Sequence, residues 1–272
     1  MKTEPLKRLL ATVIFALILA SALPARLMAQ DPMSGVDLNS PEMSEAEMSR
    51  VDVVAFIATA KRNGTVADLT AKRLSGLDLS GMDLSHVILR SARLNKTKLV
   101  RANLTGAVLD QAWLLGADLT EAKLTKASLF QAQMREAILD LSDLTGVRMT
   151  GDLTKASLRG VKLIDADLSA NMRNQSMGLI RGVLRSADLE NANLSGANLS
   201  HTNFEFASLK GANLSNANLM SAELAGANMT GATVTNTNFT NADVTSTRLT
   251  QLIDAGTSTL DSSRNLSRAV RD

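Results

Sequence analysis

The sequence predicts an all-β solenoid, in which short repeats stack along one shared core. Almost every fifth residue between Leu69 and Leu249 is leucine or another apolar residue, and 36 of the 37 positions on this five-residue grid are filled. Within most repeats an alanine precedes the leucine by two residues, with Asp or Asn between them, as in Ala117-Asp118-Leu119. A helix would place apolar residues at i, i+3, i+4 and i+7, so the five-residue period argues against a helical repeat.

The two-residue step between Ala and Leu defines the cross-section of one repeat. Successive side chains of an extended segment point to opposite faces, so Ala and Leu point inward and the Asp or Asn between them points outward. The two remaining positions mostly hold Thr, Ser, Gly, Asn or Lys, which suit a corner. Each repeat can bury its apolar side only against its neighbours. The central leucines therefore form the predicted core, among them Leu104, Leu119, Leu199 and Leu214.

These motifs resemble the pentapeptide-repeat family, whose unit is Ala-(Asp/Asn)-Leu-x-x. The resemblance covers residues 65–250 and includes Ala102-Asn103-Leu104, Ala197-Asn198-Leu199 and Ala212-Asn213-Leu214. It implies a right-handed quadrilateral parallel β-helix, with one pentapeptide on each side of the coil. A narrow interior of this kind agrees with the aromatic content of 3%.

The first 29 residues predict a secretory signal peptide. Lys2, Lys7 and Arg8 precede a mostly apolar stretch that is short for a membrane span, which needs about 20 residues. Cleavage after Ala22 or Ala29 fits the small residues there, and an uncleaved anchor is the alternative. We therefore expect an exported protein without membrane insertion after cleavage, located in a bacterial periplasm, secreted, or in the thylakoid lumen if the source is cyanobacterial.

The charge balance argues against a nucleic-acid partner and also against mimicry of a nucleic acid. The full chain has a formal net charge of +2, and removal of residues 1–29 takes away four basic residues and one acidic residue, leaving −1. Some cytoplasmic members of the resembled family mimic the DNA duplex and act on DNA gyrase. Such mimicry needs a dense line of negative charge. The chain also has no cysteine, which excludes a disulfide framework and a lipoprotein anchor.

Residues 30–64 are predicted to form a lead-in and a short N-terminal capping helix over residues 44–62. Ser44 and Glu47 have the spacing of a capping box, and Gly64 follows as a stop signal. An apolar stripe is expected to face the solenoid and cover its open edge; it consists of Met48, Val51, Val54, Ala55 and Ala58.

The repeat grid slips once. The step from Met149 to Leu153 is four residues, and the next clear centre after Leu168 is Leu179, which restores the phase. One continuous solenoid with a loop or bulge at 170–178 explains this compensation, and two separate domains are the alternative. Residues 251–272 are expected to form a C-terminal cap or tail, with a short helix within 257–272.

No catalytic, cofactor or metal motif is evident, so the sequence predicts neither an enzyme nor a cofactor. His86 and His201 are the only histidines and are interpreted as surface residues. The outward aspartates share columns with basic residues, as in Asp78, Lys98 and Asp118, which predicts a charge-compensated face.

One surface goes beyond this pattern. A basic belt of Arg90, Arg93, Lys96, Lys98 and Arg101 lies next to the only tryptophan. Arg93 stacked on Trp113 is one interpretation. The other is a partner contact, since Trp and Arg are common at binding hot spots. The candidate contact residues are Arg73, Arg93, Lys96, Trp113, Leu115 and Arg135.

The sequence thus favours a non-enzymatic exported repeat protein that serves as a rigid scaffold for protein or cell-envelope interactions. Binding of an anionic envelope component through the basic Arg/Trp face is the first alternative. A DNA-mimic modulator of gyrase is the second, disfavoured by the near-neutral charge and the signal peptide. The partner is an unknown protein or envelope component, and a homodimer also remains open.

Overall fold

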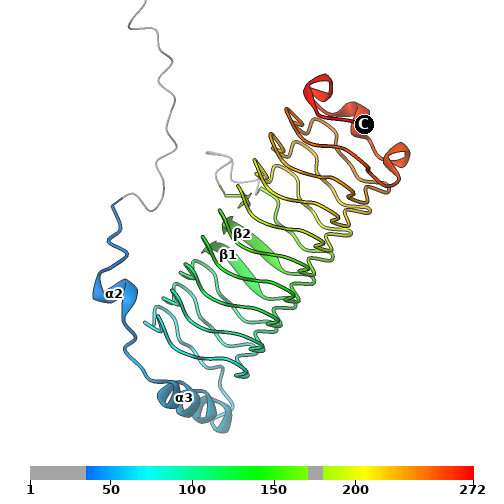
Figure 1. The fold of residues 1–272 in the computed structure, drawn as a ribbon. Helices are drawn as coiled ribbons and strands as arrows, with labels where there is room; N and C mark the ends of the chain where they lie inside the picture. Colours follow the sequence, from blue (N-terminus) through cyan, green and yellow to red (C-terminus); the bar gives the residue numbers. More distant parts are fainter. Residues whose placement is uncertain (1–34, 171–179) are drawn as a thin grey trace, which may run out of the picture. The chain divides into compact units, whose positions relative to one another are not determined.

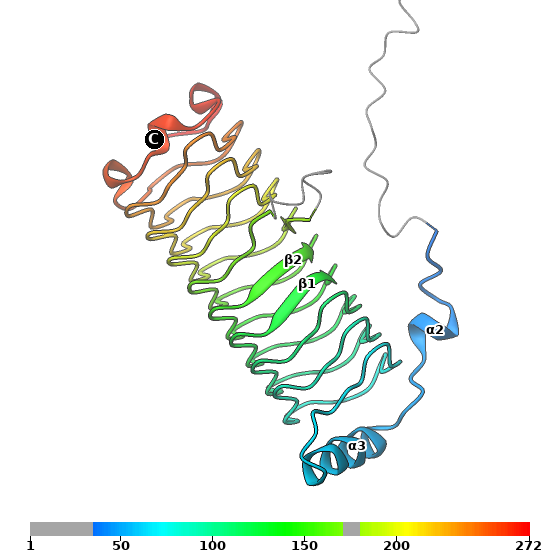
Figure 2. The same cartoon turned by 180° about the vertical axis from the view of Figure 1, so that it is seen from behind.

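A computed structural model of the protein describes residues 35–170 and 180–272. The chain divides into two compact units, Met1–Leu38 and Asn39–Asp272. The predicted signal peptide lies outside the described residues. The second unit begins with helices α2 (Pro41–Ser44) and α3 (Arg50–Arg62) and continues as a stack of coils, shown from two sides in Figures 1 and 2.

Parallel bridges between residues twenty apart hold the coils in register. Asp78 pairs with Lys98, and Lys98 pairs with Asp118. The backbone N–H of Leu99 donates to the carbonyl of Asp118, while the N–H of Lys98 donates back to Leu77 at 2.9 Å. The coils are therefore joined by backbone hydrogen bonds along the length of the solenoid. The longer strands are β1 (Ser128–Gln133), β2 (Arg148–Asp152) and β3 (Gly182–Val183), in one parallel sheet.

The core is a single stack of leucines and alanines. It forms one cluster that runs from Val53 to Leu249. Phe204 and Phe239 take the place of leucine in two repeats and are also fully buried. The structure also places the four leucines singled out from the sequence in this core, fully buried: Leu104, Leu119, Leu199 and Leu214.

The outward Asp or Asn of the repeat builds the corner that follows it. The Oδ1 atom of Asp118 accepts hydrogen bonds from the backbone N–H and the hydroxyl of Thr120 at 3.0 and 2.6 Å. Side-chain acceptors of this kind stabilise a turn two residues further on. The next residue, Glu121, then has a positive φ of 57°. This geometry explains why both Asp and Asn serve at the position, because each has an Oδ1 acceptor.

The four-residue step after Met149 is accommodated by a bulge between β1 and β2. Phe130 pairs with Thr150, but Ala132 pairs with Gly151, so Gln131 has no counterpart. Gly151 has a φ of 146°, and a Cβ atom there would lie 2.1 Å from the carbonyl oxygen of Ala132. Only glycine fits this shortened corner without displacing the backbone of the coil beneath.

The twenty-residue register between coils is restored after one coil that contains additional residues. Arg148 pairs with Asp167, a step of 19 residues, and Asp167 then pairs with Asn198, a step of 31. The additional residues fall around the predicted loop at 170–178, which lies outside the described residues except for Ala170. The predicted centre at Leu179 also lies outside them.

The expected start of the capping helix is wrong. Helix α3 begins at Arg50, with Ser49 as its N-cap and a capping box formed by Ser49 and Asp52. Ser44 instead ends α2, the single turn Pro41–Ser44. The side chain of Glu47, expected in the capping box, is bound to the solenoid.

Of the expected apolar stripe, Met48 packs against the core as predicted, but the part that lies on α3 faces the wrong way. Val51 and Val54 are 74% and 48% exposed, whereas Val53 is fully buried in the core cluster. Ile57 and Ala60 pack beside Val53 against the first coils. The residues at i, i+4 and i+7 from Val53 make a second apolar stripe, and this one contacts the solenoid.

The N-terminal edge of the solenoid is covered by specific side chains. In an inner coil the carbonyl of Lys98 accepts from the backbone N–H of Leu79 in the preceding coil. In the first coil the equivalent carbonyl of Asp78 accepts from Arg50, whose other Nη atom donates to Ser80 at 3.0 Å. Arg50 thus replaces part of a missing coil, which protects an edge that would otherwise pair with other chains.

The expected helix within 257–272 is also wrong. Three 3₁₀ turns are present instead: η2 (Ala255–Thr257), η3 (Leu260–Ser262) and η4 (Leu266–Arg268). Leu260 and Leu266 pack against the core, whereas Val270 is 47% exposed. These turns add residues to the corners of the last coil. Asp243 pairs with Arg264 and Arg248 pairs with Val270, so the steps are 21 and 22 residues.

The bulge gives a first testable prediction. Gly151→Ala should lower the free energy of unfolding by about 3 kcal/mol or more, because the new methyl group meets a backbone carbonyl. The matched control is Gly231→Ala, where φ is also positive but no atom lies within 4 Å of the added Cβ. The control should cost only about 1–2 kcal/mol. Urea unfolding measures both, and equal losses would contradict this account of the bulge.

Candidate interaction surfaces

The candidate contact residues lie on one flank of the solenoid. Arg73 pairs with Arg93, and Arg93 pairs with Trp113, so these three form one column across successive coils. The backbone N–H of Lys96 donates to the carbonyl of Leu115, in the neighbouring column. We call this surface the Arg93 flank; it consists of Arg73, Arg93, Lys96, Trp113, Leu115 and Arg135.

Ion pairs occupy two of its three arginines. Arg73 Nε lies 3.5 Å from Glu47 Oε2, and Arg135 pairs with Asp152. Arg93 makes no ion pair within residues 35–170 and 180–272, and its Nε atom is buried without a hydrogen-bond partner. Trp113 and Leu115 are half-buried and Lys96 is exposed.

Stacking of Arg93 on Trp113 is not found. The cation–π contacts of the described residues are Arg148 over Phe130 at 5.4 Å and Arg185 over Phe206 at 5.6 Å. The two stacked rings therefore belong to phenylalanines elsewhere in the solenoid. Trp113 lies next to Arg93 in the column, and no guanidinium of the described residues lies above its ring.

The segment Ser40–Ser49, which we call the strap, lies on the same flank. The carbonyl oxygen of Met43 accepts from Ser75 Oγ at 2.9 Å and from Asn95 Nδ2 at 3.0 Å. Asn95 Oδ1 in turn accepts from the backbone N–H of Leu115. The Met43 side chain is only 5% exposed. Neither Ser75 nor Asn95 could be identified from the sequence as a contact of this segment, because Ser and Asn are ordinary corner residues of this repeat.

Glu47 anchors the other end of the strap. Its backbone N–H donates to the carbonyl of Arg73 at 2.9 Å. Its carboxylate lies 3.3 Å from Lys72 Nζ and also pairs with Arg73. The hydrogen bond from Lys72, aided by Arg73, holds the pKa of Glu47 below its ordinary value. The negative form of Glu47 is therefore the form that binds the flank.

The rest of the basic belt is compensated by carboxylates. Arg90 lies 3.9 Å from Asp110, and Arg101 lies 3.2 Å from Glu121. Hydrogen bonds from Ser80, followed by the charges of Lys98 and Arg50, lower the pKa of Asp78. The belt therefore does not act as a continuous cationic ring.

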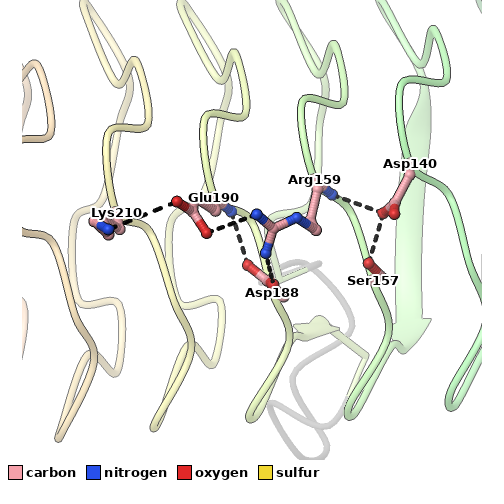
Figure 3. Close-up of polar contacts among 6 residues, drawn as sticks. All are labelled: Asp140, Ser157, Arg159, Asp188, Glu190 and Lys210. Atoms are coloured by element: carbon pink, nitrogen blue, oxygen red, sulfur yellow. Dashed lines mark hydrogen bonds and ion pairs between the residues drawn. The ribbon is translucent and has the colours of Figure 1, made fainter.

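A second surface is a ladder of alternating charges, shown in Figure 3. Arg159 lies between two carboxylates, with Nη1 2.7 Å from Asp188 Oδ2 and Nη2 2.8 Å from Glu190 Oε2. Lys210 Nζ lies 3.8 Å from the other oxygen of Glu190. On the opposite side Asp140 Oδ1 accepts from Ser157 Oγ and from the backbone N–H of Arg159.

This ladder crosses the point where the register changes. Ser157 pairs with Asp188 across a step of 31 residues, and Arg159 ties its own coil to that of Asp188 and Glu190. The two carboxylates, Asp188 first, raise the pKa of Arg159 above its ordinary value. A shallow cavity of about 350 Å³ adjoins the ladder and includes the exposed side chain of Leu141.

The two histidines do not belong to this ladder. His86 and His201 occupy corner positions with φ values of 60° and 61°. Within the described part of the chain, no three His, Asp or Glu side chains are grouped to hold a metal ion. None of the described helices is long and apolar enough to cross a membrane.

Comparison with known proteins identifies the family. The family model for pentapeptide repeats matches in eight copies, over residues 67–106, 102–140, 114–151, 183–216 and 217–251. These matches span more than half of the chain, and the protein belongs to the pentapeptide-repeat family. No curated protein sequence matches the chain.

One solved structure, that of QnrB1, shows the same fold. QnrB1, a plasmid-mediated fluoroquinolone resistance protein, is 18% identical with a TM-score of 0.50, covering 66% of this chain and 85% of its own. HetL, involved in heterocyst differentiation regulation in the cyanobacterium Nostoc, is 27% identical with a TM-score of 0.40, covering 82% and 99%. A thylakoid-lumen protein of Arabidopsis thaliana is 29% identical with a TM-score of 0.18, covering 37% and 66%.

The charge ladder gives a second prediction. Arg159→Ala should lower the stability at low salt, because it leaves two carboxylates close together without their shared cation. The matched variant Lys210→Ala removes only a long contact at the end of the ladder and should cost less than about 0.3 kcal/mol. Urea unfolding at low and high salt measures both. A loss for Arg159→Ala that does not shrink with salt would contradict the electrostatic origin.

Proposed function

We propose that the protein is a non-enzymatic, exported repeat protein that serves as a rigid scaffold for protein or cell-envelope contacts. The observation that carries this proposal is the Arg93 flank. It places the half-buried Trp113 and Leu115 beside Arg93, whose Nε atom has no hydrogen-bond partner among the described residues. Because both neighbouring coils bond to this one, the side chains are held in place before a partner arrives, and preorganised Trp and Arg residues are typical hot spots.

The finer geometry of the coil belongs to the same proposal. We infer that each coil is right-handed and four-sided. The support is arithmetic: a register of twenty residues contains four five-residue repeats. In addition, positive φ values recur at five-residue intervals, for example at Gln111, Gly116 and Glu121, so each repeat ends in a corner. The right-handed coil is the form that the family resemblance implies.

Export rests on the N-terminal sequence. The apolar stretch before Pro24 and the small residues before Leu23 and Gln30 favour a cleaved signal peptide. The mature chain would then begin at Leu23 or Gln30 and act in a periplasm, in the medium or in a thylakoid lumen.

Two other functions are weaker. An anionic envelope component would find Arg93 and Lys96 on the flank, but most of the surrounding cations are already paired with carboxylates. A DNA mimic needs about one negative charge per 1.7 Å along its length. The ladder in Figure 3 instead places Arg159 and Lys210 among its carboxylates, so the signs alternate.

Photo-crosslinking in the source cells tests the scaffold proposal. A photoreactive phenylalanine analogue in place of Trp113 should give a discrete crosslinked product of higher mass. The matched control position is Met220, which is more exposed than Trp113 and lies outside the Arg93 flank. We expect no discrete product there. Absence of a product at Trp113, or the same smear of products at both positions, would contradict the proposed contact surface.

A further inference from the structure

The strap and the flank beneath it have opposite charges. The strap contains Glu42, Glu45 and Glu47 and no basic residue from Ser40 to Ser49. Arg73 of the flank and its sequence neighbour Lys72 hold Glu47, and Arg93 and Lys96 follow one coil later. Glu42 and Glu45 remain exposed. The protein thus displays one bound example of what this flank accepts, which is an acidic segment.

The contacts are those of a short linear motif. Ser75 and Asn95 recognise a main-chain carbonyl, that of Met43, and would do so for any residue at this position. The slot beside them buries one apolar side chain. Four residues later, Lys72 and Arg73 recognise a carboxylate. Main-chain hydrogen bonds combined with a side-chain pocket are a common mode of peptide recognition.

A second occupant of the slot has to bring a carbonyl. With the strap in place Ser75 and Asn95 are 4% and 7% exposed, and both donate to the carbonyl of Met43. A segment that covered these donors without an acceptor would leave them buried and unpaired, which is costly. Within the described residues Arg93 forms no ion pair and its Nε atom has no hydrogen-bond partner, so the positive charge of Arg93 is not compensated. An acidic ligand would supply a negative charge beside it.

The strap itself is held at few points. Between Ser40 and Ser49, its hydrogen bonds and ion pairs to the solenoid come from Met43 and Glu47, and Met48 packs against the core. Its only helix is the single turn α2. Segments with few buried contacts open at low free energy. Exchange of the strap for another segment is therefore feasible without unfolding the coils.

We propose that this slot is a docking site for an acidic peptide of a partner protein, with an apolar residue in place of Met43 and a carboxylate four residues later. The strap occupies the site in the free protein, and the partner segment replaces it. The inference rests on the scaffold function proposed above and specifies the chemistry of its partner.

The test uses a fluorescent peptide of residues 39–49 and the full chain. Met43→Asp places a charge in the buried slot and should release the strap. The peptide should then bind this variant at least tenfold more tightly than the wild-type chain, measured by fluorescence anisotropy. Binding should weaken severalfold between 50 and 300 mM salt, because charged groups are part of the contact. A Glu47→Gln peptide should bind more weakly.

A matched pair of second substitutions locates the site. Met43→Asp combined with Ser75→Ala should reduce peptide affinity severalfold, because Ser75 Oγ donates to the bound carbonyl. Met43→Asp combined with Ser85→Ala should not, since Ser85 occupies the equivalent corner two sides further along the first coil. Glu47→Lys, which repels Lys72 and Arg73, releases the strap without altering the slot. It should also bind the peptide more tightly than the wild type.

Three results would overturn the proposal. The first is equal peptide binding by the wild type and both opened variants. The second is peptide binding that Ser75→Ala does not weaken. The third is a wild-type chain that light scattering shows to be a dimer and that becomes a monomer when Met43→Asp releases the strap, because the strap would then bind a second copy of the chain. The crosslinking experiment at Trp113 reports the scaffold function separately. A crosslink at Trp113 without peptide binding would refute this inference and leave the scaffold function standing.

Discussion

The fixed register between stacked coils is the constraint on which the rest of the structure depends. The backbone N–H of Leu119 donates to the carbonyl of Ile138 at 2.7 Å, and that of Asp118 donates to Thr97 at 3.0 Å, so each coil is bonded on both sides. The interior holds one large and one small side chain per repeat, mostly leucine and alanine, so a change of spacing needs a local adjustment of the backbone. Where a residue is missing, the coil resolves the mismatch with glycine, as at Gly151.

The same register organises the surface. Equivalent positions of successive coils lie side by side, so a charge affects the residues in its column rather than its neighbours in sequence. Arg159 meets Asp188 and Glu190 for this reason, although about thirty residues separate them in the chain. The strap depends on the same regularity, because Ser75 and Asn95 are stacked corner residues that both donate to the carbonyl of Met43. A repeat fold can thus create a specific slot from two unremarkable residues.

The sequence predicted the core and the spacing because period and burial are local properties of the repeat. It did not predict the orientation of α3, since Val53, Ile57 and Ala60 form a helical stripe as regular as the one expected. The contacts of Glu47 and Arg50 with the edge of the first coil favour one stripe, and these contacts are non-local. The candidate contact residues do lie on one flank. The strap that covers part of it could not be foreseen, because its partners are 32 and 52 residues away.

The most direct test of the central claim compares two adjacent residues of one repeat. Leu119 is fully buried in the stack, whereas Asp118 points outward and uses an Oδ1 atom that asparagine also provides. Leu119→Asp should lower the free energy of unfolding by about 4 kcal/mol or more, because it buries an unpaired charge. Asp118→Asn should change it by less than about 0.5 kcal/mol. Urea unfolding of the two variants decides the matter, and similar losses in both would contradict the inward and outward assignment on which the account is built.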